Sequence, residues 1–118
     1  MPHIRAIFVD TLPNREFIKK RKTAIRQIVS EKTGYPLQQI AFIAEPIRAD
    51  VWELSENVSP ICFVPEIGVK VKTEKQAEAC AKKIKAEILK RCLNADKTDF
   101  SVWLRGYPVN GHVEHRAK

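Results

Sequence analysis

The stretch that decides the fold is MPHIRAIFVDTLPN, residues 1–14, in which a proline at position 2 leads directly into an apolar segment. Apolar and polar side chains alternate over residues 3–10, which predicts a strand buried on at least one face. The next four residues, TLPN, break this strand, and Asn14 is expected to cap a helix. The chain therefore begins with a strand that turns at once into a helix.

A long amphipathic helix is predicted from about residue 15 to residue 33, where Gly34 ends it. Its apolar side chains recur at steps of three and four residues: Phe17, Ile18, Ala24, Ile25, Ile28 and Val29. Tyr35-Pro36 then forms a turn, and the apolar residues 40–44 predict a central strand closed by Glu45-Pro46. These elements complete one strand–helix–strand unit.

The second half of the chain repeats this order after a connecting segment. Residues 47–60 lack periodicity, so we expect a loop or loose hairpin around Val51-Trp52. Residues 61–71 predict a strand that is broken near Pro65 and Gly68.

A second helix is expected to start at Thr73, which has the capping-box spacing to Gln76, and to extend to about residue 93. The side chains predicted to be buried on it are Ala77, Cys80, Ala81, Ile84, Ile88 and Cys92. A short strand at 100–104, a turn at 106–108 and a polar tail over 110–118 complete the chain.

The element order predicts an α/β (α+β) fold made of two consecutive β-α-β units, at about 2–58 and 60–115. Because crossovers between parallel strands are right-handed, the units combine into a four-stranded mixed sheet with both helices on one face. Nothing else in the chain is expected to cover the other face, which favours a homo-oligomer.

The composition is that of a globular protein: 118 residues, 44% hydrophobic and 30% charged, with 4 glycines. This length suits one domain, 1–118, and the composition excludes disordered, collagen-like and low-complexity chains. No apolar stretch reaches the roughly 20 residues of a membrane span, and the first residues lack the order of a secretory signal. We expect a cytoplasmic protein without a membrane partner.

The charge is unevenly distributed, with 21 Lys and Arg against 14 Asp and Glu, a net +7. Residues 1–35 carry +5, residues 36–66 carry −4 and residues 67–118 carry +6. Such a field favours an anionic partner, which leaves nucleic acid, an acidic surface and a small carboxylate substrate open.

Metal and disulfide chemistry have little support in the sequence. The cysteines are odd in number and the last two lie about 18 Å apart on one predicted helix, which favours free thiols at Cys62, Cys80 and Cys92. His112 and His115 have a spacing that binds metals on a helix, but Pro108 and Gly111 argue against a helix there. We expect neither a metal nor a cofactor.

The Met-Pro start before an apolar strand, together with the doubled β-α-β unit, resembles the tautomerase superfamily. Two further stretches are similar to its longer members: Thr33-Gly34-Tyr35-Pro36 before Gln39-Ile40-Ala41, and Glu66-Ile67-Gly68. The resemblance implies a homotrimer in which Pro2, freed by removal of Met1, acts as a general base. It also implies isomerase chemistry on a small keto/enol or unsaturated carboxylate, with dehalogenase, hydratase or decarboxylase variants.

Substrate-binding positions follow from the same resemblance and are carried over residue by residue: Arg15, Tyr35, Trp52, Ile67, Lys70, Lys72, Trp103 and Arg105. The arginines and lysines would hold a carboxylate, Ile67 would offer a backbone group, and the tryptophans would wall the site. Residues 40–44 lack the second arginine of some relatives, and Tyr35 stands where other relatives have a lysine.

Two alternatives from other classes stay open. A tautomerase-like trimer that has lost catalysis would act as a binding protein, which the missing second arginine favours. A β-α-β-β-α-β order with +7 charge also fits a ferredoxin-like nucleic-acid-binding module. The Lys/Arg-Gly-Phe/Tyr core of the RNA-binding signature is absent from the sequence, which makes that module the weaker alternative.

Overall fold

The computed structural model describes residues 2–48, 59–68, 71–106 and 109–117. Its elements are β1 (His3–Val9), α1 (Leu12–Thr33), β2 (Ala41–Ile47), β3 (Ile61–Gly68), α2 (Glu74–Arg91), β4 (Phe100–Gly106) and β5 (Asn110–His115). Short 3₁₀ turns, η1 (Leu37–Gln39) and η3 (Ala95–Lys97), follow the two helices. The loop predicted around Val51-Trp52 lies outside the described residues.

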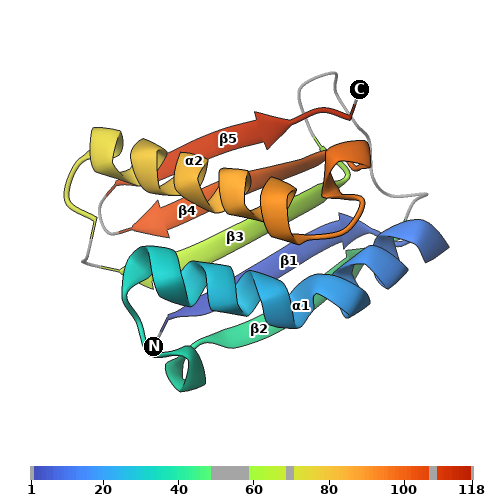
Figure 1. Cartoon of the computed structure of the whole chain (residues 1–118), viewed down its shortest axis with the longest axis horizontal. Coiled ribbons are helices and arrows are strands. Elements are labelled where there is room, and N and C mark those ends of the chain that lie inside the picture. The colour runs from blue at the N-terminus through green and yellow to red at the C-terminus, as the bar shows by residue number, and fades with distance from the viewer. Residues whose placement is uncertain (1, 49–58, 69–70, 107–108, 118) are drawn as a thin grey trace.

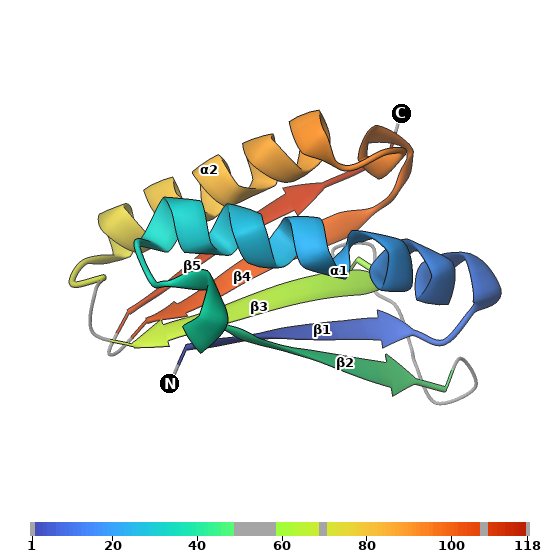
Figure 2. The ribbon, with the colours of Figure 1, turned by 60° about the horizontal axis from the view of Figure 1, so that its bottom comes forward.

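The strands form one mixed sheet in the order β2-β1-β3-β4-β5. β1 is parallel to β2 and β3 is parallel to β4, as the two crossovers require, while β1 and β3 are antiparallel. Figures 1 and 2 show α1 and α2 side by side on one face of this sheet. The predicted α+β architecture is therefore confirmed, except that the sheet has a fifth strand.

The fifth strand is formed by residues that we expected to be a polar tail. β5 pairs antiparallel with β4, with Trp103 opposite His112 and Leu104 opposite Gly111. A β-carbon added at Gly111 would lie 2.2 Å from the backbone of Ala77 in α2. Polar residues alternate with small or apolar ones here, so composition alone conceals a strand whose inner face lies against a helix.

Prolines interrupt the strands less than the sequence suggested. β2 continues through Pro46 to Ile47 and is an edge strand rather than a central one, so the missing N–H of Pro46 is tolerated. β3 continues through Pro65 and ends at Gly68, whose φ of 65° is left-handed. Its register against β4 shifts between Glu66 and Gly68, which accommodates the irregular end.

Each helix has a side-chain cap. α1 begins three residues earlier than predicted, and its N-cap is Thr11, whose Oγ1 accepts from the Asn14 N–H at 3.3 Å. Asn14 instead donates its side-chain amide to the Val9 carbonyl. Gly34 ends α1 with φ 80°, as predicted, and Thr73 caps α2 by accepting from the Gln76 N–H.

The core lies between the helix layer and the sheet and contains the apolar faces predicted for both helices. Its largest fully buried side chains include Phe63, Phe100, Ile25, Ile28, Ile84 and Ile88. The three cysteines are free thiols, as expected. Within the described ranges neither helix is long and apolar enough to cross a membrane.

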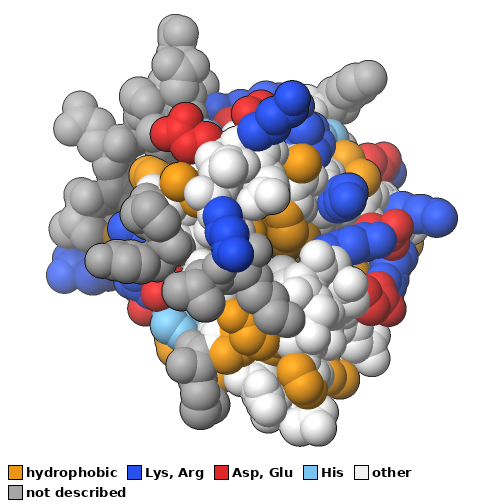
Figure 3. All heavy atoms as spheres, turned by 90° about the vertical axis from the view of Figure 1, so that its left-hand side faces the viewer, with side chains coloured by type: hydrophobic (Ala, Val, Ile, Leu, Met, Phe, Trp, Pro, Cys, Tyr) orange, Lys and Arg blue, Asp and Glu red, His pale blue; other side chains and the backbone are white. Residues whose placement is uncertain are grey.

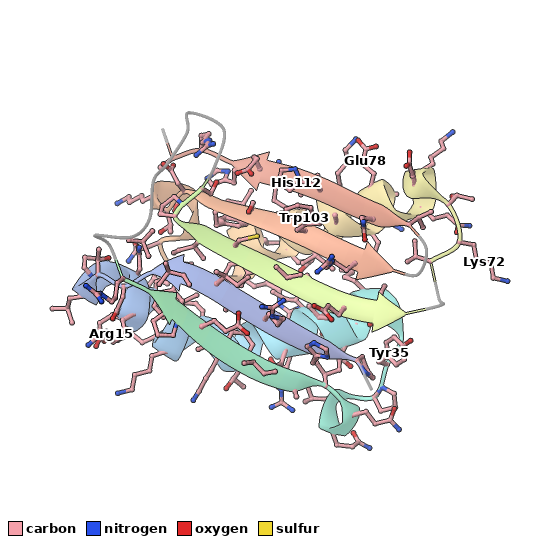
Figure 4. The ribbon with its side chains drawn as sticks, turned by 180° about the vertical axis from the view of Figure 1, so that it is seen from behind. Arg15, Tyr35, Lys72, Glu78, Trp103 and His112 are labelled. Carbon is pink, nitrogen blue, oxygen red and sulfur yellow. The ribbon has the colours of Figure 1, made fainter. Side chains whose placement is uncertain are left out.

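The opposite face of the sheet carries no helix among the described residues, and we call it the open face. Strand alternation directs the following side chains to it: His3, Arg5, Ile7, Cys62, Val64, Glu66, Ser101, Trp103, Arg105, His112 and Glu114. Figure 4 looks onto this face, with Trp103 and His112 side by side on neighbouring strands.

Candidate functional site

Pro2 lies at the end of the sheet where β1 begins and where β3 and β4 finish. The first residue of β1, His3, pairs with Glu66 in β3, and Glu66 pairs with Arg105 in β4. Pro2 is half-buried and directly precedes this row of three strands. Figure 3 faces this end of the molecule, where lysine and arginine side chains lie around patches of hydrophobic ones.

Tyr35 connects the end of α1 to the end of β3. Its hydroxyl donates to the Ile67 carbonyl at 2.5 Å, while its own carbonyl accepts from the Ser30 hydroxyl at 2.6 Å. The left-handed Gly34 turns the chain so that Tyr35 reaches β3. The structure thus brings together two of the predicted site residues, Tyr35 and Ile67, at the end of the sheet that carries Pro2.

A network of charged side chains occupies the open face next to Pro2. Arg5 donates to both carboxylate oxygens of Glu45, at 3.0 and 2.8 Å, and its third nitrogen lies 3.7 Å from Glu66. Glu66 also lies 3.0 Å from His3 Nε2. The hydrogen bonds from Arg5 lower the pKa of Glu45, and those to Glu45 raise the pKa of Arg5.

Sequence reasoning did not single out this network. Its charges come from three strands that are distant in the sequence, so only the register brings them together. The one feature of the sequence that could have indicated the network is the alternation in β1. Polar His3 and Arg5 lie on the face opposite buried Ile4 and Ala6.

Lys72 follows β3 at the same end of the sheet. Its side chain is exposed, and its backbone N–H donates to the Gln76 side-chain oxygen at 3.0 Å. Figure 4 shows Lys72 and Tyr35 at the same end of the sheet. Lys70 and Trp52, two other predicted site residues, lie outside the described residues.

Arg15 lies at the opposite end of the sheet from Pro2. It follows β1, whose seven residues span roughly 20 Å, and its guanidinium pairs with Asp10 at 2.7 Å. Figure 4 shows Arg15 and Tyr35 at opposite ends. Within one chain, Arg15 therefore does not share a site with Pro2.

Trp103 and Arg105, the last two predicted site residues, line a hollow of about 320 Å³ in the open face. This open-face hollow also contains Arg5, Val64, Cys62 and His112. A larger hollow, of about 460 Å³, lies beside the first half of α1 and shares no residue with the end of the sheet that carries Pro2.

The wall of the open-face hollow is held by hydrogen bonds from β5. Glu114 accepts from Ser59 on one carboxylate oxygen, and its other oxygen lies 2.8 Å from His112 Nε2. The rings of His112 and Trp103 lie 5.5 Å apart. On the floor, burial raises the pKa of the Cys62 thiol, so the group is an apolar lining rather than a nucleophile at neutral pH.

Comparison with known proteins identifies the fold. The sequence matches no known family profile and no curated protein. Its structure is similar to that of malonate semialdehyde decarboxylase, with a TM-score of 0.58 and 14% identity over 87% of this chain and 82% of that chain. It is also similar to a member of the cis-3-chloroacrylic acid dehalogenase family, with a TM-score of 0.59 and 11% identity over 88% of this chain and 73% of that chain.

A third similar structure is native fused 4-OT, with a TM-score of 0.54 and 13% identity over 88% of this chain and 85% of that chain. These are structures of the tautomerase superfamily, and the chain has their fold over about 88% of its length. The predicted resemblance is confirmed for the fold. At 11–14% identity the similarity establishes the fold only. The activity has to be inferred from the residues of the site.

Proposed function

We propose that this protein is a tautomerase-type enzyme in which Pro2, freed by removal of Met1, is the general base. The substrate is a small anionic keto/enol compound or unsaturated carboxylate. The observation that carries the proposal is the position of Pro2, half-buried and directly before β1, at the end of the sheet where β3 and β4 finish.

The chemistry suits an N-terminal proline. An α-amino group titrates at about 7.7–8.0 in model peptides, and partial burial of the kind that Pro2 has lowers that pKa. The secondary amine of Pro2 would then be neutral near pH 7. It takes the hydroxyl proton of an enol as its own ammonium proton, and it returns that proton to carbon as the keto form appears.

The substrate carboxylate requires a cation at the same end of the sheet. Lys72 is exposed there, and we assign it to the carboxylate as a point charge. Tyr35 has the role of holding the Ile67 carbonyl, which fixes the end of β3 against which the substrate lies. Pro2, Lys72 and the Tyr35–Ile67 pair together form the proposed site.

One solved relative supports the role given to Pro2. Malonate semialdehyde decarboxylase is described in wild-type, inactivated and mutant forms, the mutant replacing its first-position proline by alanine, in connection with decarboxylase and hydratase activities. By analogy of fold, Pro2 is the position in this chain at which such chemistry would occur.

A homotrimer is part of the proposal. Trp103 on the open face is 46% exposed, and Ile43, which pairs with Arg5 from the edge strand β2, is 43% exposed, which favours contact with other copies. One similar structure, a fused 4-OT with a TM-score of 0.52 and 11% identity, is an asymmetric trimer. Light scattering after size exclusion should give about three times the chain mass, and a monomer at all concentrations would contradict the trimer.

The test of the catalytic proposal is ketonisation of phenylpyruvate or 2-hydroxymuconate by the Pro2→Ala variant. General-base catalysis contributes about 10²–10⁴-fold, so kcat/KM should fall by at least about 100-fold. Pro13→Ala is the matched control, because Pro13 lies in the first turn of α1 at the far end of the sheet. Absence of turnover in the wild type, with a trimeric mass, would instead favour the non-catalytic binding protein.

A further inference from the structure

The two β-α-β units are related by an approximate twofold axis that passes between β1 and β3. These two strands are antiparallel, and each is parallel to the strand that follows its own helix. Pro2 directly precedes β1, and Pro60 directly precedes β3. The axis therefore places Pro60 at one end of the sheet as it places Pro2 at the other.

The surroundings of the two prolines correspond as well. Pro2 lies beside the end of β3, and Pro60 lies beside the end of β1, where the Val9 N–H donates to the Pro60 carbonyl at 2.9 Å. A left-handed residue follows each helix: Gly34, with φ 80°, after α1 and Asn94, with φ 66°, after α2. A 3₁₀ turn comes next in both units, η1 in the first and η3 in the second. The second unit thus repeats the framework of the proposed site.

Beside Pro60 this framework encloses the hollow of about 460 Å³, which we call the Pro60 hollow. Its walls are the first turns of α1 and the residues in and around η3. The volume falls within the range of small-ligand sites, roughly 300–1,000 Å³. No residue of the open face lines the Pro60 hollow, so contacts between copies through that face do not fill it.

Arg21 is an ordered donor in the wall of the Pro60 hollow. Its Nε and Nη2 donate to the Leu93 carbonyl at 3.0 and 2.7 Å, and its guanidinium lies 5.1 Å from the centre of the Phe17 ring. Its third nitrogen, Nη1, forms no hydrogen bond or ion pair with the described residues. A carboxylate that reaches Nη1 meets a cation that is already held in place, so little side-chain entropy is lost on binding.

Lys97 supplies a second cation to the Pro60 hollow. Its side chain is exposed and forms no ion pair within the described part of the chain. Two other charges already have partners: Lys20 lies 3.6 Å from Glu16, and Asp99 accepts the Ala117 N–H at 2.6 Å. Three cations face two carboxylates in the lining, which leaves a net charge of +1 and favours an anionic ligand.

We propose that the Pro60 hollow is a second site for a small carboxylate, which Arg21 and Lys97 hold and which the protein does not convert. The Pro60 nitrogen forms the peptide bond with Ser59, so its lone pair is delocalised and it cannot act as a base. The site goes beyond the proposed function. It rests on the repeated framework and on the lining of the hollow, and it stands whether or not Pro2 is catalytic.

The probe for this proposal is crotonate, a small unsaturated carboxylate, compared with the neutral crotonamide by two-dimensional NMR titration of the full chain. The backbone amides of Asn94, Lys97 and Thr98 report on the Pro60 hollow, and those of Tyr35 and Ile67 report on the Pro2 end. Crotonate should shift the first set of amides saturably. Because hydrogen bonds to charged groups are the strong ones, crotonamide should bind there at least about tenfold more weakly.

Variants then test the two cations. Arg21→Gln should weaken the crotonate affinity measured at the Pro60 hollow by about tenfold or more, and Lys97→Gln, whose cation is exposed, by about threefold or more. Lys75→Gln is the matched control, because it removes an equal charge from the exposed start of α2 and should change nothing. Arg21 also holds the Leu93 carbonyl, so Lys97→Gln keeps the test decisive if Arg21→Gln does not fold.

The same titration of Pro2→Ala separates this proposal from the catalytic one. We expect the crotonate affinity measured at Asn94 and Thr98 to be unchanged in Pro2→Ala. Saturable binding there in a protein without turnover would contradict the catalytic proposal alone. Shifts confined to Tyr35 and Ile67, equal affinities for crotonate and crotonamide at the Pro60 hollow, or an affinity there that neither Arg21→Gln nor Lys97→Gln reduces would each overturn the second site.

Discussion

Arg5 and Glu45 are joined across β1 and β2 by two parallel hydrogen bonds, Nε to Oε1 at 3.0 Å and Nη2 to Oε2 at 2.8 Å. This pair neutralises the cation nearest to the start of β1 on the open face. It also links the edge strand β2 to the rest of the sheet, and its contribution to stability depends on the charge of Glu45.

Replacement of Glu45 by Gln should destabilise the protein at neutral pH and have little effect in acid. Because the folded-state pKa of Glu45 is lowered, its stabilisation is present above the unfolded pKa of about 4.3 and is lost as the pH falls through the folded value. Urea midpoints of wild type and Glu45→Gln should differ at neutral pH and converge as the pH falls below the lowered folded-state pKa of Glu45. Glu16→Gln, which removes an exposed pair with Lys20, is the control, and an equal pH dependence there would refute the role of Glu45.

Gly111→Ala should be strongly destabilising because the new β-carbon would meet the backbone of Ala77 at 2.2 Å. Overpacking typically costs about 1–3 kcal/mol, and this contact is with backbone that cannot rotate away. Gly68→Ala is the matched control: its β-carbon meets nothing within 4 Å, so only the left-handed φ of 65° opposes it, by about 1–2 kcal/mol. Urea denaturation should rank Gly111→Ala as the more costly, and the reverse order would contradict the packing of α2 on β5.

Tyr35→Phe should lower the free energy of unfolding by about 1 kcal/mol, because it deletes the hydrogen bond to the Ile67 carbonyl and keeps the ring. In the proposed enzyme it should also reduce kcat/KM, since the end of β3 loses its link to α1. Ser30→Ala tests the neighbouring hydrogen bond to the Tyr35 carbonyl. A Tyr35→Phe variant with unchanged stability and unchanged turnover would remove Tyr35 from the site.

The three thiols should react slowly in the folded protein. Burial raises the pKa of Cys62, of Cys80 and of Cys92, so less of each is thiolate at pH 8 than the free value of about 8.5 gives. Iodoacetamide followed by mass spectrometry should show modification much faster in urea than in buffer. Rapid modification of Cys62 in buffer would contradict its place on the floor of the open-face hollow.

The fold was predictable because its two helices have clear apolar periodicity and because single residues mark some of their ends. Thr73 caps the start of α2, and Gly34 ends α1. Phe17, Ile25 and Ile28 are buried as predicted. Strand ends were harder, because Pro46 and Pro65 are tolerated within strands at an edge and beside a register shift. β5 was missed because Gly111 and Val113 are too few apolar residues to mark a strand that one helix covers.

Pro2 could be proposed from the sequence because its position at the start of the first strand is local information. The resemblance named Tyr35 and Ile67 separately as site residues, and the hydrogen bond that joins them across 32 positions was not predicted. The ion pairs of Arg5 and the hollow beside Trp103 depend on strand register, which no single segment encodes. The sequence therefore proposes Pro2 as the catalytic position, whereas the side chains around it are identified only by the fold.

The most direct test of the central claim is the pH dependence of phenylpyruvate ketonisation by protein whose intact mass shows that Met1 has been removed. Turnover should rise with pH through a single ionisation and level off when the Pro2 amine is neutral, and it should be lost in Pro2→Ala. A rate that is unaffected by Pro2→Ala, or an active sample that retains Met1 and hence has no basic nitrogen at Pro2, would contradict the account.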